Sequence, residues 1–269
     1  MATVSVHIVL VHGACHGAWC WYKLKPLLEA AGHRVTALDL AASGIDRRSL
    51  QELRTLDEYS QPLLELMASI PATEKVVLVG HSLGGMNIAL AMEMYPHKVA
   101  AAVFLAAFMP NYTHAPSYVL DQYNERTSAE AWLDTEFLPY GSPEENLTSM
   151  LFGPNFTSSK LYQLCTPEDL ELAKSLVRPS SLFLEDLSKR SRFTKEGFGS
   201  VKRVFAVCKE DKGIPLDFQQ WQIAENGVDE VKVLENIDHM AMLSKPNDVC
   251  QCLLEIAKVY AFNIFNTTI

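Results

Sequence analysis

The sequence has little of what characterises membrane-spanning, secreted or nucleic-acid-binding chains. No apolar run reaches the ~20 residues that a helix needs to cross a bilayer, and the first residues lack the basic and apolar segments of a signal peptide. The chain has 269 residues, with 23 Lys and Arg against 32 Asp and Glu, so its net charge is −9. Because an acidic surface repels phosphate groups, we expect neither nucleic acid nor a membrane as a partner.

Cysteine pairs and cofactor motifs are also missing. The six cysteines are scattered and form no C-x-x-C pair, which predicts reduced thiols in a cytoplasmic protein. The sequence contains no phosphate-binding loop, dinucleotide fingerprint or metal motif, so we expect no cofactor. His12 and His16 are four residues apart in a glycine-containing loop, but no carboxylate or third ligand follows nearby. We therefore expect no metal either.

What the chain does contain is a regular alternation of strands and helices. Hydrophobic residues make up 48% of it, enough for a sizeable core. Apolar β-branched runs alternate with segments of helical spacing, which predicts an α/β fold with a mainly parallel sheet flanked by helices. The predicted strands are 6–11, 34–39, 74–79, 98–106, 201–207 and 230–234, and the predicted helices are 19–31, 56–70, 85–94, 215–225 and 246–259.

The alternation stops between residues 108 and 184. Seven prolines interrupt this stretch, which is too long for a connection inside a compact β–α repeat. We expect an inserted, mostly helical cap over residues 108–184, on a core formed by residues 1–107 and 185–269.

The pentapeptide Gly80–Gly84 fits the pattern G-x-S-x-G between a predicted strand and a predicted helix. A serine on such a sharp turn is the nucleophile elbow of an α/β-hydrolase. The two glycines suit a crowded turn, where a Cβ atom would clash with a neighbouring strand or helix. Ser82 is therefore the predicted nucleophile.

A serine needs an adjacent base, and in this fold the acid and then the histidine follow the serine along the chain. His239 comes directly after the last predicted strand, where the fold places its base. Asp211 follows the preceding strand and is the predicted acid, which would orient the imidazole. Glu210 and Asp238 are alternatives for the acid; Asp238 is adjacent to His239 in sequence, but neighbouring side chains usually point apart.

Two backbone N–H groups are expected to form the oxyanion hole. Leu83 follows the nucleophile, and Ala14 lies in the loop after the first strand. Aromatic and other apolar residues are frequent in the cap, which predicts a mostly apolar pocket over Ser82; these residues are Phe108, Tyr123, Trp132, Phe137, Tyr140, Met150, Phe152, Leu182 and Phe183.

Along nearly its whole length the chain resembles the plant methylesterase and hydroxynitrile lyase group of α/β-hydrolases. The matching stretches are Val9–Trp19, Trp21–Glu29, Val35–Gly44, Gly80–Met86, Phe198–Val204 and Asp238–Leu243, and two cap stretches, Gln122–Arg126 and Trp132–Glu145, resemble members that hydrolyse methyl salicylate. The resemblance implies a homodimer and a Ser82–Asp211–His239 triad. It also implies a substrate pocket formed by Gly13, Ala14, His81, Phe108, Tyr123, Trp132, Met150, Leu182 and Met240.

Three positions favour hydrolysis over cyanohydrin cleavage. The lyases of this group carry Thr in place of Gly13, a residue other than His in place of His81, and Lys in place of Met240. A lysine stabilises the leaving cyanide, which Met240 cannot do. We therefore expect a serine carboxylesterase that acts on small apolar methyl esters such as those of salicylate, jasmonate or indole-acetate. The alternatives are a hydroxynitrile lyase and a hormone-binding receptor with negligible turnover.

Overall fold

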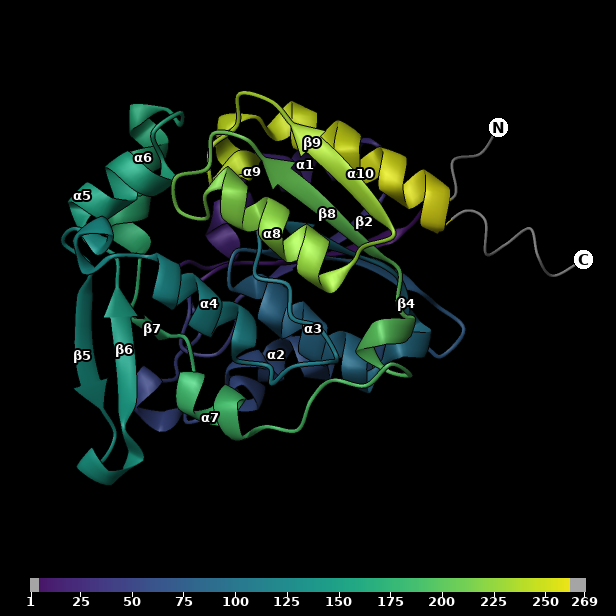
Figure 1. Cartoon of the computed structure of the whole chain (residues 1–269). Coiled ribbons are helices and arrows are strands. Elements are labelled where there is room, and N and C mark those ends of the chain that lie inside the picture. Colours follow the sequence, from purple (N-terminus) through teal and green to yellow (C-terminus); the bar gives the residue numbers. More distant parts are fainter. Residues whose placement is uncertain (1–4, 262–269) are drawn as a thin grey trace, which may run out of the picture.

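The six predicted core strands form one sheet in the computed structural model, which describes residues 5–261 (Figure 1). All neighbouring strands in it are parallel, in the order β2-β1-β3-β4-β8-β9. The strands are β1 (His7–Val11), β2 (Arg34–Leu38), β3 (Val76–His81), β4 (Val99–Leu105), β8 (Arg203–Cys208) and β9 (Glu230–Leu234). The predicted parallel sheet is thus confirmed, and each strand lies within two residues of its predicted bounds.

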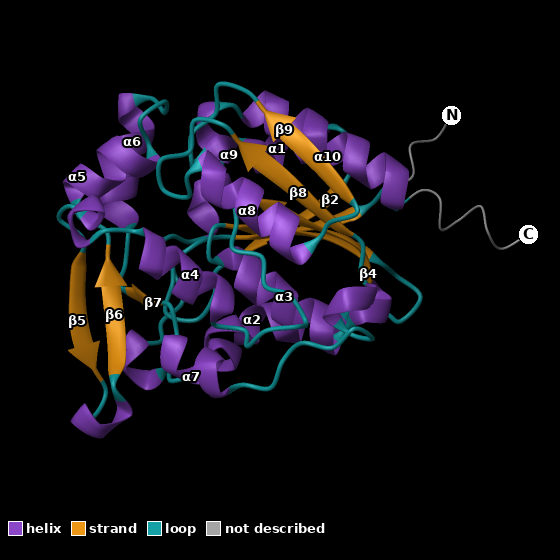
Figure 2. Ribbon diagram, in the orientation of Figure 1, coloured by secondary structure: helices purple, strands orange, loops and turns teal. Residues whose placement is uncertain are grey.

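Helices cover both faces of this sheet (Figure 2). Alternate residues of β1 belong to different hydrophobic clusters, since Ile8 and Leu10 pack with one set of helices and Val9 and Val11 with the other. The first set is α1 (Leu24–Ala30) and α10 (Pro246–Tyr260), and the second is α2 (Leu56–Ser69), α3 (Gly84–Met94) and α8 (Leu216–Asn226). Within residues 5–261, none of the helices combines the length and the apolar character that spanning a bilayer requires.

The first predicted helix is split in two. Residues Ala18–Trp21 form a 3₁₀ turn, and α1 begins only at Leu24. Pro26 explains the late start, because proline has no N–H and is tolerated only in the first turn of an α-helix.

The inserted cap contains more strand than the sequence predicted. Beside α4 (Tyr118–Arg126), α5 (Pro154–Phe156) and α6 (Pro167–Leu176), it has an antiparallel sheet in the order β5-β6-β7 (Figure 2). The strands are β5 (Glu136–Tyr140), β6 (Leu147–Leu151) and β7 (Ser180–Ser181). Pro139 argues against a strand in the sequence, but β5 is an edge strand, where a missing N–H is tolerated. The cap is mostly helical, as expected, but its small sheet was not predicted from the sequence.

The topology brings four loops to one edge of the core sheet. The loops after β1 and β3 are neighbours because these two strands pair directly. The loops after β8 and β9 are neighbours for the same reason. All four follow the carboxyl ends of parallel strands, which is where ligand sites lie in open α/β sheets.

Candidate active site

Ser82 occupies a strained turn between β3 and α3. Its φ angle is +54°, a left-handed conformation that is uncommon for residues other than glycine. Backbone hydrogen bonds to the Ser82 carbonyl from the N–H groups of Gly85 and Phe108 hold the turn, at 3.1 and 3.0 Å. A Cβ on Gly84 would lie 2.6 Å from the Val11 carbonyl oxygen, so only glycine fits beside β1. The turn has the geometry of a nucleophile elbow.

Asp211 lies in the loop after β8 and is almost completely buried. Its Oδ1 atom accepts hydrogen bonds from the N–H groups of Gly213 and Ile214 at 2.7 and 2.8 Å, and its Oδ2 atom is 2.8 Å from Nδ1 of His239. The carboxylate therefore fixes the imidazole with its proton on Nδ1 and leaves Nε2 free to accept one. The alternative acid Glu210 is exposed to solvent, and the carboxylate hydrogen-bonded to the imidazole is that of Asp211.

Gln219 of α8 holds both ends of the loop that carries Asp211. Its side-chain N–H₂ donates to the carbonyl oxygens of Cys208 and Ile214, at 3.0 and 2.7 Å, and its Oε1 atom accepts from the Cys208 N–H at 3.0 Å. The Gln219 side chain is fully buried. These three bonds restrict the position of the acid from a neighbouring helix.

The other alternative acid, Asp238, points away from the imidazole and joins the cap to the core. Its carboxylate accepts from the Leu164 N–H at 2.8 Å and from the Ser244 hydroxyl at 2.7 Å. The Cys165 thiol also lies within 3.5 Å. Burial raises the pKa of Asp238 above its ordinary value, although the hydrogen bonds oppose this.

Two free N–H groups lie beside the candidate nucleophile. Within residues 5–261, the backbone N–H groups of Ala14 and Leu83 donate to no protein acceptor, although both residues are buried. Buried backbone N–H groups almost always have a hydrogen-bond acceptor. Two such groups without an acceptor beside the same serine therefore suggest that a ligand oxygen is their partner. The Ala14 and Leu83 side chains border the same cavity as Ser82. This arrangement matches an oxyanion hole.

Two histidines of the first loop are used for structure. His12 donates from Nδ1 to the Gly13 carbonyl at 2.8 Å and accepts at Nε2 from the Leu40 N–H at 3.1 Å. His16 donates from Nδ1 to the Ala14 carbonyl and accepts from the Tyr162 hydroxyl, both at 2.8 Å. Burial lowers the pKa of His12 and lowers that of His16 to about 3, so both are neutral. Both nitrogens of each ring are engaged, which leaves none for a metal.

A small cavity of about 30 Å³ lies in front of Ser82 and His239. The Tyr123 hydroxyl donates to the Gly213 carbonyl and so links α4 of the cap to the loop of Asp211. Six of the nine residues expected to form the substrate pocket line this cavity, namely Ala14, Phe108, Tyr123, Trp132, Met150 and Leu182.

The remaining three expected substrate-binding residues lie behind the cavity. The His81 ring is buried; its Nε2 donates to the His239 carbonyl at 2.8 Å, and burial lowers its pKa well below the ordinary value. Met240 is fully buried at the start of the short helix α9 (Ala241–Ser244). Neither side chain lines the cavity, contrary to the expectation. Gly13 instead supports the nucleophile, since a Cβ there would lie 2.7 Å from the Ser82 Cβ.

Five further residues line the cavity that the sequence had not identified as substrate-binding. Phe152 belongs to the aromatic residues of the cap, which gave a usable signal. The other four come from short helical turns and a loop whose inward direction no periodicity reveals; they are Phe156, Leu161, Gly213 and Ile214.

Comparison with known proteins agrees with this geometry. Residues 8–251 match the model of the alpha/beta hydrolase family. Salicylic acid-binding protein 2 of Nicotiana tabacum is 70% identical over 254 residues, which cover 94% of this chain and 98% of that protein. Methylesterase 1 of Arabidopsis thaliana is 57% identical over 252 residues, or 93% and 95% of the two chains. A crystal structure of polyneuridine aldehyde esterase, 54% identical, superposes with a TM-score of 0.93 and covers 94% of this chain and all of that one.

Proposed function

The chain belongs to the plant methylesterase family of α/β-hydrolases, and from this membership and the geometry of its site we propose that it hydrolyses methyl esters of small, apolar acids. Methyl salicylate is the first candidate substrate, because a relative with 70% identity is named for binding salicylic acid. The observation that carries the proposal is the position of Ser82. It lies on a strained elbow and shares a small apolar cavity with an Asp211-bound His239.

In the proposed acylation step, the Ser82 hydroxyl attacks the ester carbonyl carbon while Nε2 of His239 takes its proton. Asp211 keeps the imidazole in the required tautomer and stabilises the imidazolium that forms. The N–H groups of Ala14 and Leu83 donate to the oxyanion, and each such donor typically contributes about 3 kcal/mol to transition-state stabilisation. His239 then returns the proton to the methoxy group, and methanol leaves.

In the proposed deacylation step, a water molecule takes the place of methanol. His239 removes a proton from this water as it attacks the acyl-enzyme carbonyl, and the same two N–H groups stabilise the second oxyanion. The Ser82 oxygen leaves with the proton from His239, and the free acid departs. The cycle needs no cofactor, because the base, the nucleophile and the oxyanion donors all belong to the chain.

Met240, which follows His239 in the sequence, disfavours a hydroxynitrile lyase activity, because it is uncharged and fully buried and so cannot stabilise a leaving cyanide. The test is to assay the purified protein on methyl salicylate, methyl jasmonate, methyl indole-acetate and mandelonitrile. We expect multiple turnovers on at least one ester and only trace cyanide release. A single turnover followed by tight product binding would indicate a receptor instead, and cyanide release as fast as any ester hydrolysis would indicate a lyase.

A homodimer in the cytoplasm is proposed as the working state. The family resemblance supports the dimer, and the edge strand β9 exposes the apolar side chains of Val231 and Val233. The buried thiols of Cys15 and Cys20, whose pKa values are raised by burial, suit a reducing compartment. Light scattering coupled to size exclusion measures the oligomeric state directly, and a monomer at micromolar concentration would contradict the dimer.

A further inference from the structure

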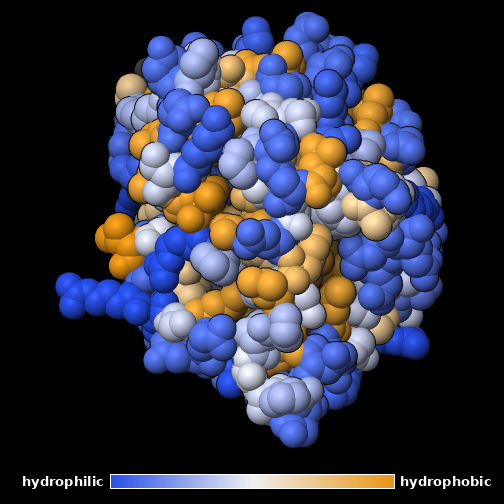
Figure 3. Space-filling model, turned by 90° about the vertical axis from the view of Figure 1, so that its left-hand side faces the viewer, coloured by the Kyte–Doolittle hydropathy of each residue, from blue (hydrophilic) through white to orange (hydrophobic). Residues whose placement is uncertain are grey.

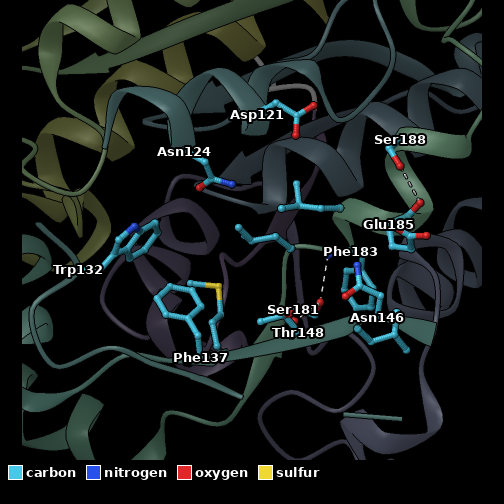
Figure 4. A pocket seen from close by; sticks show the side chains of 14 residues that line it. Asp121, Asn124, Trp132, Phe137, Asn146, Thr148, Ser181, Phe183, Glu185 and Ser188 are labelled. Atoms are coloured by element: carbon cyan, nitrogen blue, oxygen red, sulfur yellow. Dashed lines mark hydrogen bonds between the residues drawn. The ribbon is translucent and has the colours of Figure 1, made fainter. Parts of the chain in front are cut away.

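A second and much larger cavity lies in the cap, next to the catalytic one. Its volume is about 480 Å³, against about 30 Å³ for the cavity at Ser82. Figure 4 shows Asp121 and Asn124 reaching it from α4, Phe137 on one side, and Glu185 on the opposite side, from α7 (Leu184–Lys189). On the cap face seen in Figure 3, hydrophobic side chains come to the surface in the middle and hydrophilic ones surround them. We name this space the outer chamber.

Three side chains separate the outer chamber from the catalytic cavity. Trp132, Met150 and Leu182 line both spaces, so they form the wall between them. The catalytic cavity has room for about one or two water molecules, whereas ligand sites commonly measure about 300–1,000 Å³. An ester therefore fits at Ser82 only when this wall moves, and the space that it then gains is the outer chamber.

The three side chains of the wall differ in how firmly they are held. Trp132 is packed edge-to-face against Tyr123 and Phe137 and stacked on Phe156, with ring centroids 5.2 to 5.9 Å apart. Met150 is buried among apolar neighbours, and its unbranched chain adopts other rotamers easily. Met150 is therefore the side chain most able to open the wall while Trp132 stays in place.

The walls of the outer chamber change in character from its floor to its rim. The floor beside Met150 and Leu182 is apolar, and Phe137 extends it. Asp121 and Glu185 line the chamber and are partly exposed to solvent, so we place them at its rim; Glu185 is paired with Lys189 at 2.5 Å. Within residues 5–261 the Asp121 carboxylate has no ion-pair partner, so the rim carries a net negative charge.

We propose that the outer chamber is a binding site for the distal part of the substrate's acyl group, beyond the wall formed by Trp132, Met150 and Leu182. The site takes an ester whose acyl group is apolar near the carbonyl and ends in a neutral or cationic group rather than a carboxylate. This inference rests on the proposed ester hydrolysis at Ser82 and adds to it the class of acyl group.

The first experiment measures kcat/KM for methyl esters of straight-chain acids from butyrate to decanoate. If the chain enters the outer chamber, kcat/KM rises about three- to fourfold for each methylene that becomes buried. A value that falls or stays level beyond butyrate would overturn the site. Hydrolysis of methyl butyrate itself reports on the proposed function, so the failure of each claim is visible separately.

The second experiment fills the chamber. Asn124 lines it and its side chain makes no hydrogen bond within residues 5–261, so Asn124→Trp places a large ring inside it. We expect the decanoate-to-butyrate ratio of kcat/KM to fall at least tenfold. The matched control is Glu125→Trp, which adds the same ring at an exposed position of the same helix and should keep the ratio of the unmodified protein. Thr148→Trp fills the chamber from β6 and provides a second variant if Asn124→Trp folds poorly. Equal ratios in all of these proteins would overturn the proposal.

The third experiment tests the charge at the rim. The dimethyl ester of suberic acid is neutral at its far end, and the monomethyl ester is anionic. We expect the unmodified protein to prefer the dimethyl ester, and Asp121→Asn to reduce this preference by about two- to fivefold, the size of a solvent-exposed charge effect. A preference that is the same in both proteins would show that the acyl end does not reach the rim.

Discussion

The catalytic edge of the core and the cap above it are built in different ways. Directional hydrogen bonds hold the core groups, for example the two backbone N–H bonds to Asp211 and the 2.8 Å bond from Asp211 to His239. The cap side chains that face them, such as Trp132 and Met150, are positioned by ring contacts and apolar packing, which tolerate more displacement than hydrogen bonds do. The difference suggests that the reaction is fixed by the core, whereas the range of substrates is set by a region that adjusts.

The strands of the core and those of the cap also differ in how far their residues are buried. Every residue of β3 and β4, which lead into the site, is buried, whereas four of the five residues of β5 in the cap are exposed. Segments with few buried contacts open at a lower free-energy cost than the core does. The cap is therefore expected to move while the catalytic groups stay in place.

The largest effect should come from removing the nucleophile. Ser82→Ala should lower ester turnover by about 10⁴-fold or more without unfolding the protein, because the acyl-enzyme can no longer form. Ser43→Ala is the matched control, since Ser43 is also a buried serine but its hydroxyl is hydrogen-bonded to Tyr59. Steady-state hydrolysis and circular dichroism measure both properties. Activity above a tenth of that of the unmodified protein in Ser82→Ala would exclude the proposed role.

Substitutions of Asp211 and Asp238 should have different effects, the first on catalysis and the second on the attachment of the cap to the core. Asp211→Asn should lower kcat by about 10⁴-fold, because the imidazole loses the acceptor that fixes its tautomer. Asp238→Asn should change kcat by less than tenfold. It should instead lower the free energy of unfolding by about 1–3 kcal/mol, since asparagine keeps only one acceptor oxygen and its N–H₂ group then faces either the N–H of Leu164 or the hydroxyl of Ser244. Steady-state kinetics and urea denaturation measure the two effects. If Asp238→Asn lowered kcat more than Asp211→Asn did, the catalytic acid would be Asp238.

A single methyl group behind the nucleophile should disturb the core. The added Cβ in Gly13→Ala would lie 2.7 Å from the Ser82 Cβ, so either the serine or the loop must shift. A displacement of about 1 Å in a catalytic group costs about 100-fold in rate. We expect a loss of that size in kcat for short and long esters alike. An unchanged kcat would mean that the elbow is less rigid than its geometry indicates.

The smallest effect concerns pH and the buried histidines. The pKa values of His12, His16 and His81 are lowered by burial, that of His16 to about 3. Below the unfolded pKa of about 6.5 the unfolded chain takes up protons that the folded one refuses, so stability should fall as pH falls. Each of these histidines contributes a slope of up to about 1.4 kcal/mol per pH unit.

The pH dependence of stability should be compared between the unmodified protein and His16→Gln. This substitution removes one titrating group but keeps a hydrogen-bond donor and an acceptor. Urea denaturation at pH 5.5 to 7.5 should give a slope smaller by about 1.4 kcal/mol per pH unit at the acid end. Parallel curves for the two proteins would show that His16 has the same pKa in the folded and unfolded states, which would contradict its burial as a neutral group.

The sequence predicted the core better than the cap, and the reason is physical. Ser82, Asp211 and His239 each follow a strand whose β-branched pattern is visible, so the parallel topology alone brings them to one edge. In the cap, Pro139 made the sequence of β5 look unlike a strand. The side chains of Leu161 and Phe156 point toward the cavity because of tertiary packing, which leaves no periodic pattern in the sequence. The burial of Met240 and His81 behind the imidazole was missed because adjacency to a catalytic residue in sequence does not say which side of it a side chain occupies.

The central claim is that the core fixes the reaction and the cap selects the acyl group. The most direct test compares the rates at which a short-chain and a long-chain alkyl fluorophosphonate label Ser82, followed by mass spectrometry, because labelling needs the nucleophile but neither methanol release nor deacylation. In Gly13→Ala both rates should fall by the same factor, so the long-to-short ratio stays that of the unmodified protein. In Asn124→Trp that ratio should fall at least tenfold. A ratio that changes in Gly13→Ala, or stays constant in Asn124→Trp, would contradict this division.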